Sequence, residues 1–350
     1  MSKIAQSLGL DAPIIQAPMA GSQDAALAVA VCNAGGLGAL PAAMHTPESL
    51  RDEVTTLRRQ TARPYNINFF AHRPPAENPA TLAAWHEALA PYYTEFGLDP
   101  EQIPTGAGRA PFSAAFADLV EQLKPAVVSF HFGLPADALL QRVKATGAQI
   151  WSSATTLEEA LWLQAEGVDA IIAQGVEAGG HRGMFLTEDV RQQPSLATLL
   201  AQIVTRVTVP VIAAGGIATA EDIAAAKALG ADAVQIGTAY LCTPEATTSA
   251  VHRNALLSPH AADTALTNLF SGRPARGIVN RLMRELGPIS PLAPAFPLAT
   301  AGIAPLRSAA EKTGSGDFSP LWAGQNARAI RALPAATLTR EFAAAWMHTG

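Results

Sequence analysis

The sequence predicts an α/β protein of the (β/α)8 TIM-barrel class, and three observations lead to this prediction. The chain has 350 residues, 49% of them hydrophobic and 15% charged, which suffices for one large barrel or two ordinary domains. Short apolar segments alternate with helix-like segments eight times before residue 257. The apolar segments are continuous rather than alternating, as expected for parallel strands covered on both faces. A closed barrel of eight such units takes roughly 250 residues.

Local signals place the individual elements. Asp24 and Thr46 have side chains that cap helix N-termini, and Pro47 suits a first helical position. Gly35 and Gly36 end the first barrel helix. The expected strands, some with their following loops, are residues 13–21, 37–40, 65–69, 126–130, 149–152, 170–173, 210–217 and 233–238. The expected helices are residues 25–33, 47 onward, 115–123, 135–146, 156–166, 196–207, 220–229 and 247–257.

Two further segments lie outside this period. Residues 71–110, after the third strand, are too long for an ordinary strand-to-helix loop, so we expect an insertion with one helix near 81–93. Residues 258–350 are irregular and rich in proline at 288–306. We therefore expect a barrel at 1–257 and a C-terminal extension at 258–350 that packs over the barrel mouth and is not independent.

Composition excludes several classes of function. The net charge of -5 favours neither nucleic acid nor an anionic membrane surface. The N-terminus lacks the apolar stretch of a signal peptide, and the long uncharged run at residues 288–306 holds five prolines and does not predict a membrane helix. The two cysteines, Cys32 and Cys242, have no metal-ligand spacing and suit a reducing compartment. We therefore expect a cytoplasmic protein.

Polar residues and glycines follow the predicted strands. The loops after the strands of such a barrel share one face, and that face carries function. The loop at 174–183 contains four glycines, His181 and Arg182. Glycines allow backbone N–H groups to approach a ligand, and a histidine can orient, polarise or deprotonate a substrate. Taken alone, this loop could equally be a flexible surface loop with a solvated histidine.

Paired glycines after the last two strands predict a phosphate site. Gly215 and Gly216 follow the seventh strand, and Gly237 and Thr238 follow the eighth. This is the usual phosphate position of the fold, formed by backbone N–H groups and a short helix. The alternative is that the glycines only make tight turns.

Three amide side chains lie at the ends of apolar strands. Asn68, Gln174 and Gln235 must be hydrogen-bonded if they lie inside a barrel. Their mixed donors and acceptors suit a ring such as a flavin, although pairing among themselves is the alternative.

Other readings of these residues are weaker. Gly36 and Gly38 lie between a helix and a strand, so they do not form a dinucleotide fingerprint, which opens a helix. His131 and His181 follow different strands, but no carboxylate joins them at ligand spacing, and we expect no metal. A serine nucleophile elbow is not found in the sequence.

The strand-end motifs resemble, in order along the chain, those of the nitronate monooxygenases, formerly called 2-nitropropane dioxygenases. The resemblance covers nearly the whole chain, and the strings at 129–133 and 180–183 favour the class I enzymes. It rests on Gln-Ala-Pro-Met-Ala-Gly at 16–21, Asn-Ile-Asn-Phe-Phe at 66–70, Ser-Phe-His-Phe-Gly at 129–133, the loop 174–183, Ala-Ala-Gly-Gly-Ile at 213–217, Gln-Ile-Gly-Thr at 235–238, and residues 267–276 and 321–325.

The resemblance implies an FMN enzyme that oxidises a nitronate with O2 to an aldehyde or oxo acid and nitrite. It implies that His181 faces the substrate, as a base or an electrostatic anchor, and that His131 assists. Residues 296–298 would close the mouth, with Phe296 where relatives often have tyrosine. The implied partners are a nitronate and O2, with a homodimer left open. The implied FMN-binding residues are Met19, Asn68, Gln174, Gly179, Gly215, Gly216, Gln235, Ile236, Gly237 and Thr238.

Two alternatives remain. FMN reductases that use NAD(P)H, on quinones or on enoyl thioesters, share the barrel and the glycine-histidine loop, and consumption of NAD(P)H distinguishes them. A non-redox barrel that binds sugar phosphates would need a carboxylate or lysine at a strand end, and the strand-end residues above include neither.

Overall fold

Eight parallel strands form the barrel in this computed structural model, which describes residues 2–76, 78–106 and 108–348. The strand order is β1-β9-β8-β6-β5-β4-β3-β2, and a parallel bridge between Ile15 and Leu37 closes the ring. The predicted barrel is confirmed, and every expected strand is present. The strands are β1 (Ile14–Gln16), β2 (Gly38–Pro41), β3 (Tyr65–Phe70), β4 (Val127–His131), β5 (Gln149–Ala154), β6 (Ala170–Gln174), β8 (Val211–Ala214) and β9 (Ala233–Ile236).

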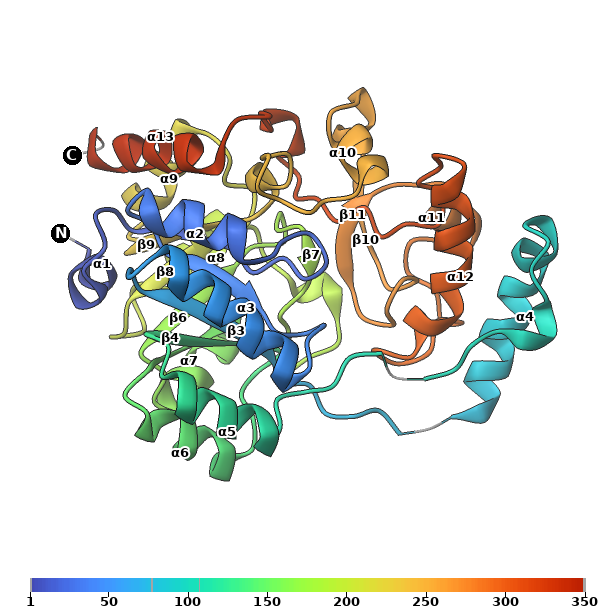
Figure 1. The fold of residues 1–350 in the computed structure, drawn as a ribbon, viewed down its shortest axis with the longest axis horizontal. Helices are drawn as coiled ribbons and strands as arrows, with labels where there is room; N and C mark the ends of the chain where they lie inside the picture. The colour runs from blue at the N-terminus through green and yellow to red at the C-terminus, as the bar shows by residue number, and fades with distance from the viewer. Residues whose placement is uncertain (1, 77, 107, 349–350) are drawn as a thin grey trace.

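Helices cover the outside of the strands (Figure 1). The Asp24 side chain accepts a hydrogen bond from the Ala26 amide, and Thr46 forms a capping box with Ser49, so both predicted caps are present. The covering helices are α2 (Ala25–Asn33), α3 (Pro47–Gln60), α5 (Ala114–Leu123), α6 (Asp137–Ala145), α7 (Leu157–Ala165), α8 (Leu196–Ile203), α9 (Ala220–Ala228) and α13 (Ala335–His348).

The eighth barrel helix is α13 and not the expected segment 247–257. α13 lies between α9 and α2 (Figure 1), and its Leu338 and Phe342 are buried in the core that the strands share with their helices. The expected segment forms α10 (Ala250–Leu256), whose Leu256 packs instead with Ile278 and Leu321 of the extension. The extension is therefore inserted between β9 and its helix, and the chain returns to the barrel well beyond the expected boundary at 257.

The insertion and the extension pack together into one body, here called the cap. It consists of α4 (Pro79–Glu95), β10 (Thr264–Thr267), β11 (Ala275–Ile278), α11 (Arg281–Glu285) and α12 (Ala299–Lys312). Trp85 and Leu89 of α4 share a core with Leu306 of α12. Figure 1 shows α4 beside α12 and joined to the barrel by two long connections.

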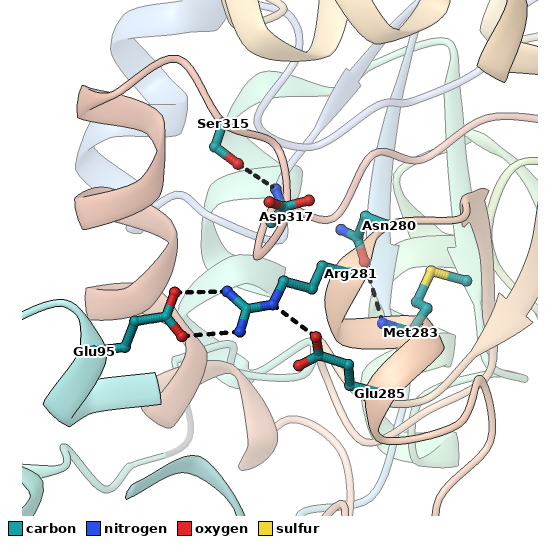
Figure 2. Close-up of polar contacts among 7 residues, drawn as sticks. All are labelled: Glu95, Asn280, Arg281, Met283, Glu285, Ser315 and Asp317. Atoms are coloured by element: carbon teal, nitrogen blue, oxygen red, sulfur yellow. Dashed lines mark hydrogen bonds and ion pairs between the residues drawn. The ribbon is translucent and has the colours of Figure 1, made fainter. Parts of the chain in front are cut away.

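An exposed ion-pair group, here called the clasp, also joins the two parts of the cap (Figure 2). The Arg281 guanidinium donates two hydrogen bonds to the Glu95 carboxylate, at 2.7 and 2.8 Å, and a third to Glu285 at 2.8 Å. Arg281 and Glu285 belong to α11 of the extension, whereas Glu95 ends α4 of the insertion. The clasp therefore fixes the orientation of α4 relative to the extension.

A short strand connects the cap to the predicted functional loop. β7 (Gly180–His181) pairs antiparallel with β11, where His181 lies opposite Ala275. The remaining elements are α1 (Lys3–Leu8) and the 3-10 helices η1 (Pro100–Gln102), η2 (Val190–Gln192), η3 (Thr238–Tyr240), η4 (Pro259–Ala262) and η5 (Ala327–Ala329). Among the helices of the described ranges, none combines the length and apolar character that crossing a membrane requires.

Candidate active site

A cavity opens at the carboxyl ends of the barrel strands, where the fold places function. Together with the open space at its mouth it measures about 1350 Å³. The strand-end residues that line it include Met19, Asn68, His131, Gln174, Gly179, His181, Gly215, Gly216, Gln235, Gly237 and Thr238.

These residues include all but one of the site residues expected from the sequence. The exception is Ile236, whose side chain is buried between the strands and the covering helices and packs in the barrel core. Side chains alternate along a strand, so Gln235 and Ile236 point to opposite faces, and only Gln235 lines the cavity. Ile236 is therefore a core residue, not a cavity residue.

The loop that bears His181 is held from below by two side chains. The Gln174 amide donates to the His181 carbonyl at 2.9 Å and accepts from the Gly183 amide at 2.8 Å. His131 Nε2 lies 3.1 Å from the same His181 carbonyl, and His131 Nδ1 lies 3.0 Å from Ser153 Oγ. Because a carbonyl only accepts, His131 Nε2 carries the proton and Nδ1 accepts from Ser153.

Both histidines are neutral at ordinary pH. Burial lowers the pKa of His131 to about 4, although its bond to the His181 carbonyl opposes the shift. The pKa of His181 lies well below its usual value because of burial and then because of the Arg109 charge. His181 Nε2 also lies 2.8 Å from Ser271 Oγ of the cap. The site therefore offers neutral imidazoles that donate or accept hydrogen bonds, and not imidazolium cations.

Arg182, beside His181, has a structural task. Its side chain is fully buried and donates to the carbonyls of Gly175 and Gln174, at 2.6 and 2.7 Å, and to Gln193 at 2.9 Å. Carbonyl acceptors do not neutralise the charge, so burial lowers the pKa of Arg182 to about 9. The loop is consequently rigid, which removes the alternative of a flexible loop with a solvated histidine.

The glycine loop after β8 adopts a conformation that other residues rarely take, whereas Gly237 after β9 has an ordinary φ of -114°. Gly215 and Gly216 have φ values of 124° and 70°. The Asn326 amide donates to the Gly216 carbonyl at 3.2 Å, and Thr238 Oγ1 accepts from the Gly324 amide at 3.0 Å. Residues 324–326 of the extension thus complete this end of the cavity.

Gly179 is required for packing. A Cβ atom there would lie 2.6 Å from the Gly324 nitrogen, so a side chain cannot fit without moving the backbone. Gly179 therefore allows the functional loop and the extension to approach closely.

The three expected amides differ in how their hydrogen bonds are completed. Gln174 is used to hold the His181 loop, and Asn68 donates to Ser129 Oγ at 2.9 Å. Gln235 Oε1 is buried without a hydrogen-bond partner among the described residues. Such an acceptor costs free energy unless a ligand donates to it. Hydrogen bonds within the protein therefore account for the Gln174 amide and for much of the Asn68 amide. They leave the Gln235 oxygen available to a ligand that donates a hydrogen bond.

Aromatic rings cover the His181 side of the cavity. The Phe296 ring lies 5.4 Å from the His181 ring and 4.8 Å from the His72 ring, and Trp322 lies 5.5 Å from His181. Phe296 is thus buried beside His181, and closure of the mouth by residues 296–298 stays a prediction. The surroundings of His181 are largely apolar, which accounts for its low pKa.

Several lining residues were not expected from the sequence. Phe70 and Ser153 belong to the barrel strands β3 and β5, whereas the others come from the insertion and from the chain after β9, whose irregular segments carry no strand-end signal. A buried, uncharged imidazole at His252 lies in α10, where the sequence predicted an ordinary barrel helix. The lining residues missed by sequence reasoning include Phe70, Arg109, Ser153, His252, Trp322, Gly324 and Asn326.

Fold and site together define a class of protein, a (β/α)8-barrel enzyme whose strand-end cavity is lined by glycine loops and by the neutral imidazoles of His131 and His181. The family model described as nitronate monooxygenase matches residues 2–343. A nitronate monooxygenase from Pseudomonas aeruginosa is 42% identical over 338 residues, which cover 95% of each chain.

Solved structures agree with this class. A nitroalkane oxidase from Streptomyces ansochromogenes has a TM-score of 0.89 and 40% identity and covers 99% of this chain and 98% of its own. FabK from Thermotoga maritima, at a TM-score of 0.72 and 23% identity over 100% of this chain and 97% of its own, shares the fold. The chain belongs to the nitronate monooxygenase family and is an oxidoreductase.

Proposed function

We propose that the chain is an FMN-dependent enzyme that oxidises alkyl nitronates, such as propionate 3-nitronate, with O2 to an aldehyde or oxo acid and nitrite. Membership of the family supports nitronate as the substrate. The observation that carries the proposal is the cavity in which an unpartnered buried acceptor, two glycine loops and His181 face one space.

The residues of this cavity fit FMN. Gln235 Oε1 lacks a donor, and a flavin ring presents N–H groups that could supply one. The loops at Gly215–Gly216 and Gly237–Thr238 leave backbone groups accessible to a phosphate. One such loop pair suits a mononucleotide, and FMN has one phosphate. When bound, FMN would supply the redox chemistry between the substrate and O2, while the protein positions both.

His181 is the proposed substrate-facing residue. A nitronate is already an anion, so its oxidation needs no proton to be removed from carbon. An imidazole with a pKa far below 7 is a poor base at neutral pH but keeps one N–H donor. We therefore assign His181 the task of donating a hydrogen bond and stabilising charge. A neutral nitroalkane would in addition need a base, and His181 would serve as a weak one, so activity on such a substrate would be low and would depend on His181.

His131 is proposed to position His181. Its two ring nitrogens are occupied by Ser153 and by the His181 carbonyl. It therefore has no free nitrogen for the substrate in this arrangement, and together with Gln174 it fixes the backbone that carries the His181 ring.

Two measurements test this function. Heat-released cofactor is first identified by chromatography, with FMN expected and FAD or no flavin contradicting the cofactor assignment. Propionate 3-nitronate is then added in air while nitrite and O2 are measured. Nitrite formation with O2 uptake and without NAD(P)H is the expected result. Rapid NADH oxidation with a quinone or an enoyl thioester, and no nitrite, would contradict the proposed function and indicate an FMN reductase instead.

We also propose that the protein works in a reducing compartment such as the cytoplasm. Cys32 and Cys242 are both buried and form no disulfide with one another. Burial raises the pKa of the Cys32 thiol to about 11, which keeps it protonated and unreactive.

A further inference from the structure

A half-buried arginine whose guanidinium is incompletely hydrogen-bonded lines the cavity. Arg109 comes from the connection that returns from the insertion to the barrel, and its side chain lines the same space as His181. Its NH1 nitrogen is buried and has no hydrogen-bond acceptor among the described residues. An unpaired charged donor in such a place is costly unless a ligand completes it.

The charges around Arg109 leave this cation uncompensated. Burial lowers the pKa of Arg109, and the next influence is another cation, Arg307, which lowers it further. Arg307 itself pairs with Glu311 at 2.8 Å. Among the described residues that line the cavity, Arg109 is the one with a permanent charge.

A second arginine near the site shows the contrast. Arg273 lies over the Phe132 ring, with its guanidinium carbon 4.2 Å from the ring centre, and it donates to the Met184 carbonyl. Arg273 thus has protein partners that hold it in place, as Arg182 has. Arg109 lines the cavity while its NH1 has no acceptor among the described residues, so hydrogen bonds within the described protein do not account for this nitrogen.

We propose that Arg109 is the substrate-binding residue that receives the anionic group of the nitronate. The substrate in this inference rests on the proposed function. Burial keeps the pKa values of His131, His181 and His252, the histidines that line the cavity among the described residues, too low for them to carry positive charge and balance an anion. A nitronate has two oxygens in one plane, and the guanidinium fork binds such groups with paired hydrogen bonds. Arg109 and His181 would then hold the substrate from the insertion side and the barrel side respectively.

This assignment makes the insertion part of substrate recognition. The barrel supplies the histidines and glycine loops, whereas the connection after α4 supplies the charge. Arg109 should therefore favour nitronates over neutral nitroalkanes. Only the anionic nitronate pairs with the guanidinium charge strongly enough to offset the free energy that its desolvation costs.

The experiment uses butyrate, a non-reactive carboxylate with the planar two-oxygen group of a nitronate, and butyramide, its neutral counterpart. Calorimetric titration of both into the flavin-loaded protein compares wild type, Arg109→Gln, Arg109→Lys and Arg73→Gln. Arg73 is exposed on the other connection to the insertion, so Arg73→Gln makes the same charge change away from the cavity.

Arg109→Gln should weaken butyrate binding on the order of 10- to 100-fold. Arg109→Lys should retain part of the affinity, and Arg73→Gln should match wild type. Butyramide binding should be the same in all four proteins. The KM for propyl 1-nitronate should rise with the butyrate dissociation constant. Equal butyrate affinity in wild type and Arg109→Gln would overturn the inference.

Other outcomes are also decisive. If both Arg109 variants lose flavin while wild type and Arg73→Gln keep it, Arg109 serves the cofactor and the inference is wrong. If the enzyme makes no nitrite but butyrate binding still depends on Arg109, the anion site stands and only the proposed reaction fails.

Discussion

The cavity and the clasp differ in whether their polar side chains have partners and in whether those side chains are buried. Among the residues that the structure describes, Gln235 Oε1 and Arg109 NH1 of the cavity lining are buried without a hydrogen-bond partner. In the clasp, Arg281 pairs with two carboxylates while all three side chains remain partly exposed. Completed pairs on the surface contribute little to stability, whereas incomplete groups in a buried site indicate a ligand. The difference predicts that substitutions in the cavity change binding or activity strongly and that substitutions in the clasp do not.

The largest effect is expected at Gly216. Its φ of 70° is unfavourable for a branched residue, and an added Cβ would lie 3.1 Å from Glu177 Cβ. Gly216→Val should abolish flavin retention, because the side chain blocks approach to the loop. The measurement is the flavin absorbance of the purified protein. Gly147→Val is the matched control, with a φ of 82° but open space around it. If both variants lose flavin equally, backbone strain rather than position is the cause.

The second-largest effect is expected at His181 and concerns turnover. His181→Asn keeps a hydrogen-bond donor but no base, so nitronate turnover should fall on the order of 10²- to 10³-fold while some remains. Activity on a neutral nitroalkane should be lost almost entirely. Both substrates are assayed in the variant after its spectrum confirms bound flavin. Equal losses on the two substrates would contradict the proposed division between donor and base.

An intermediate effect is expected from pH. Burial lowers the pKa of His252 from 6.5 to about 4 in the folded protein. Below pH 6.5 the unfolded chain takes up a proton that the folded protein does not, so stability is complete above pH 7 and falls as pH drops toward 4. Between pH 8 and pH 5 this costs about 2 kcal/mol.

His252→Gln tests the pH dependence, because it keeps a donor for the Trp322 carbonyl, which lies 3.0 Å from His252 Nε2. Urea unfolding with constant excess flavin should show a smaller loss of stability between pH 8 and pH 5 in this variant than in wild type. Parallel losses would mean that His252 does not titrate as described.

The smallest effect is expected in the clasp. Glu95→Gln removes the charge that pairs with Arg281, and the free energy of unfolding should change only slightly because the pair is exposed to solvent. Leu89→Ala in the same helix removes a fully buried side chain and should cost about 2–5 kcal/mol. Urea unfolding of both variants provides the comparison. A loss in Glu95→Gln that equals the loss in Leu89→Ala would mean that the clasp is a major stabilising contact.

The sequence predicted the barrel and most of its cavity because strand-end residues depend on a local pattern. The alternation of strand and helix segments along the sequence was enough to place Gln235 and His181 on the same face of the barrel. No information on contacts between distant residues was needed. The same reasoning also placed Ile236 in the site, although alternation along β9 turns its side chain into the core.

Residues supplied from far along the chain could not be predicted in this way. Arg109 and Trp322 lie in irregular segments, and their position depends on how the cap packs on the barrel. The eighth helix was misplaced for a related reason. Consecutive elements are usually neighbours, so residues 247–257 were the natural choice, but the extension intervenes between β9 and α13.

The late position of α13 has a consequence for how the barrel forms during translation. Its apolar residues Leu338, Phe342 and Trp346 cover the seam between α9 and α2. The ribosome makes α13 after every strand of the barrel. The seam between α9 and α2 therefore stays uncovered while residues 237–334 are synthesised. During this time the uncovered seam would be an apolar surface to which chaperones can bind. The barrel would be completed when α13 packs against α2 near the N-terminus and α9 near the end of the strands.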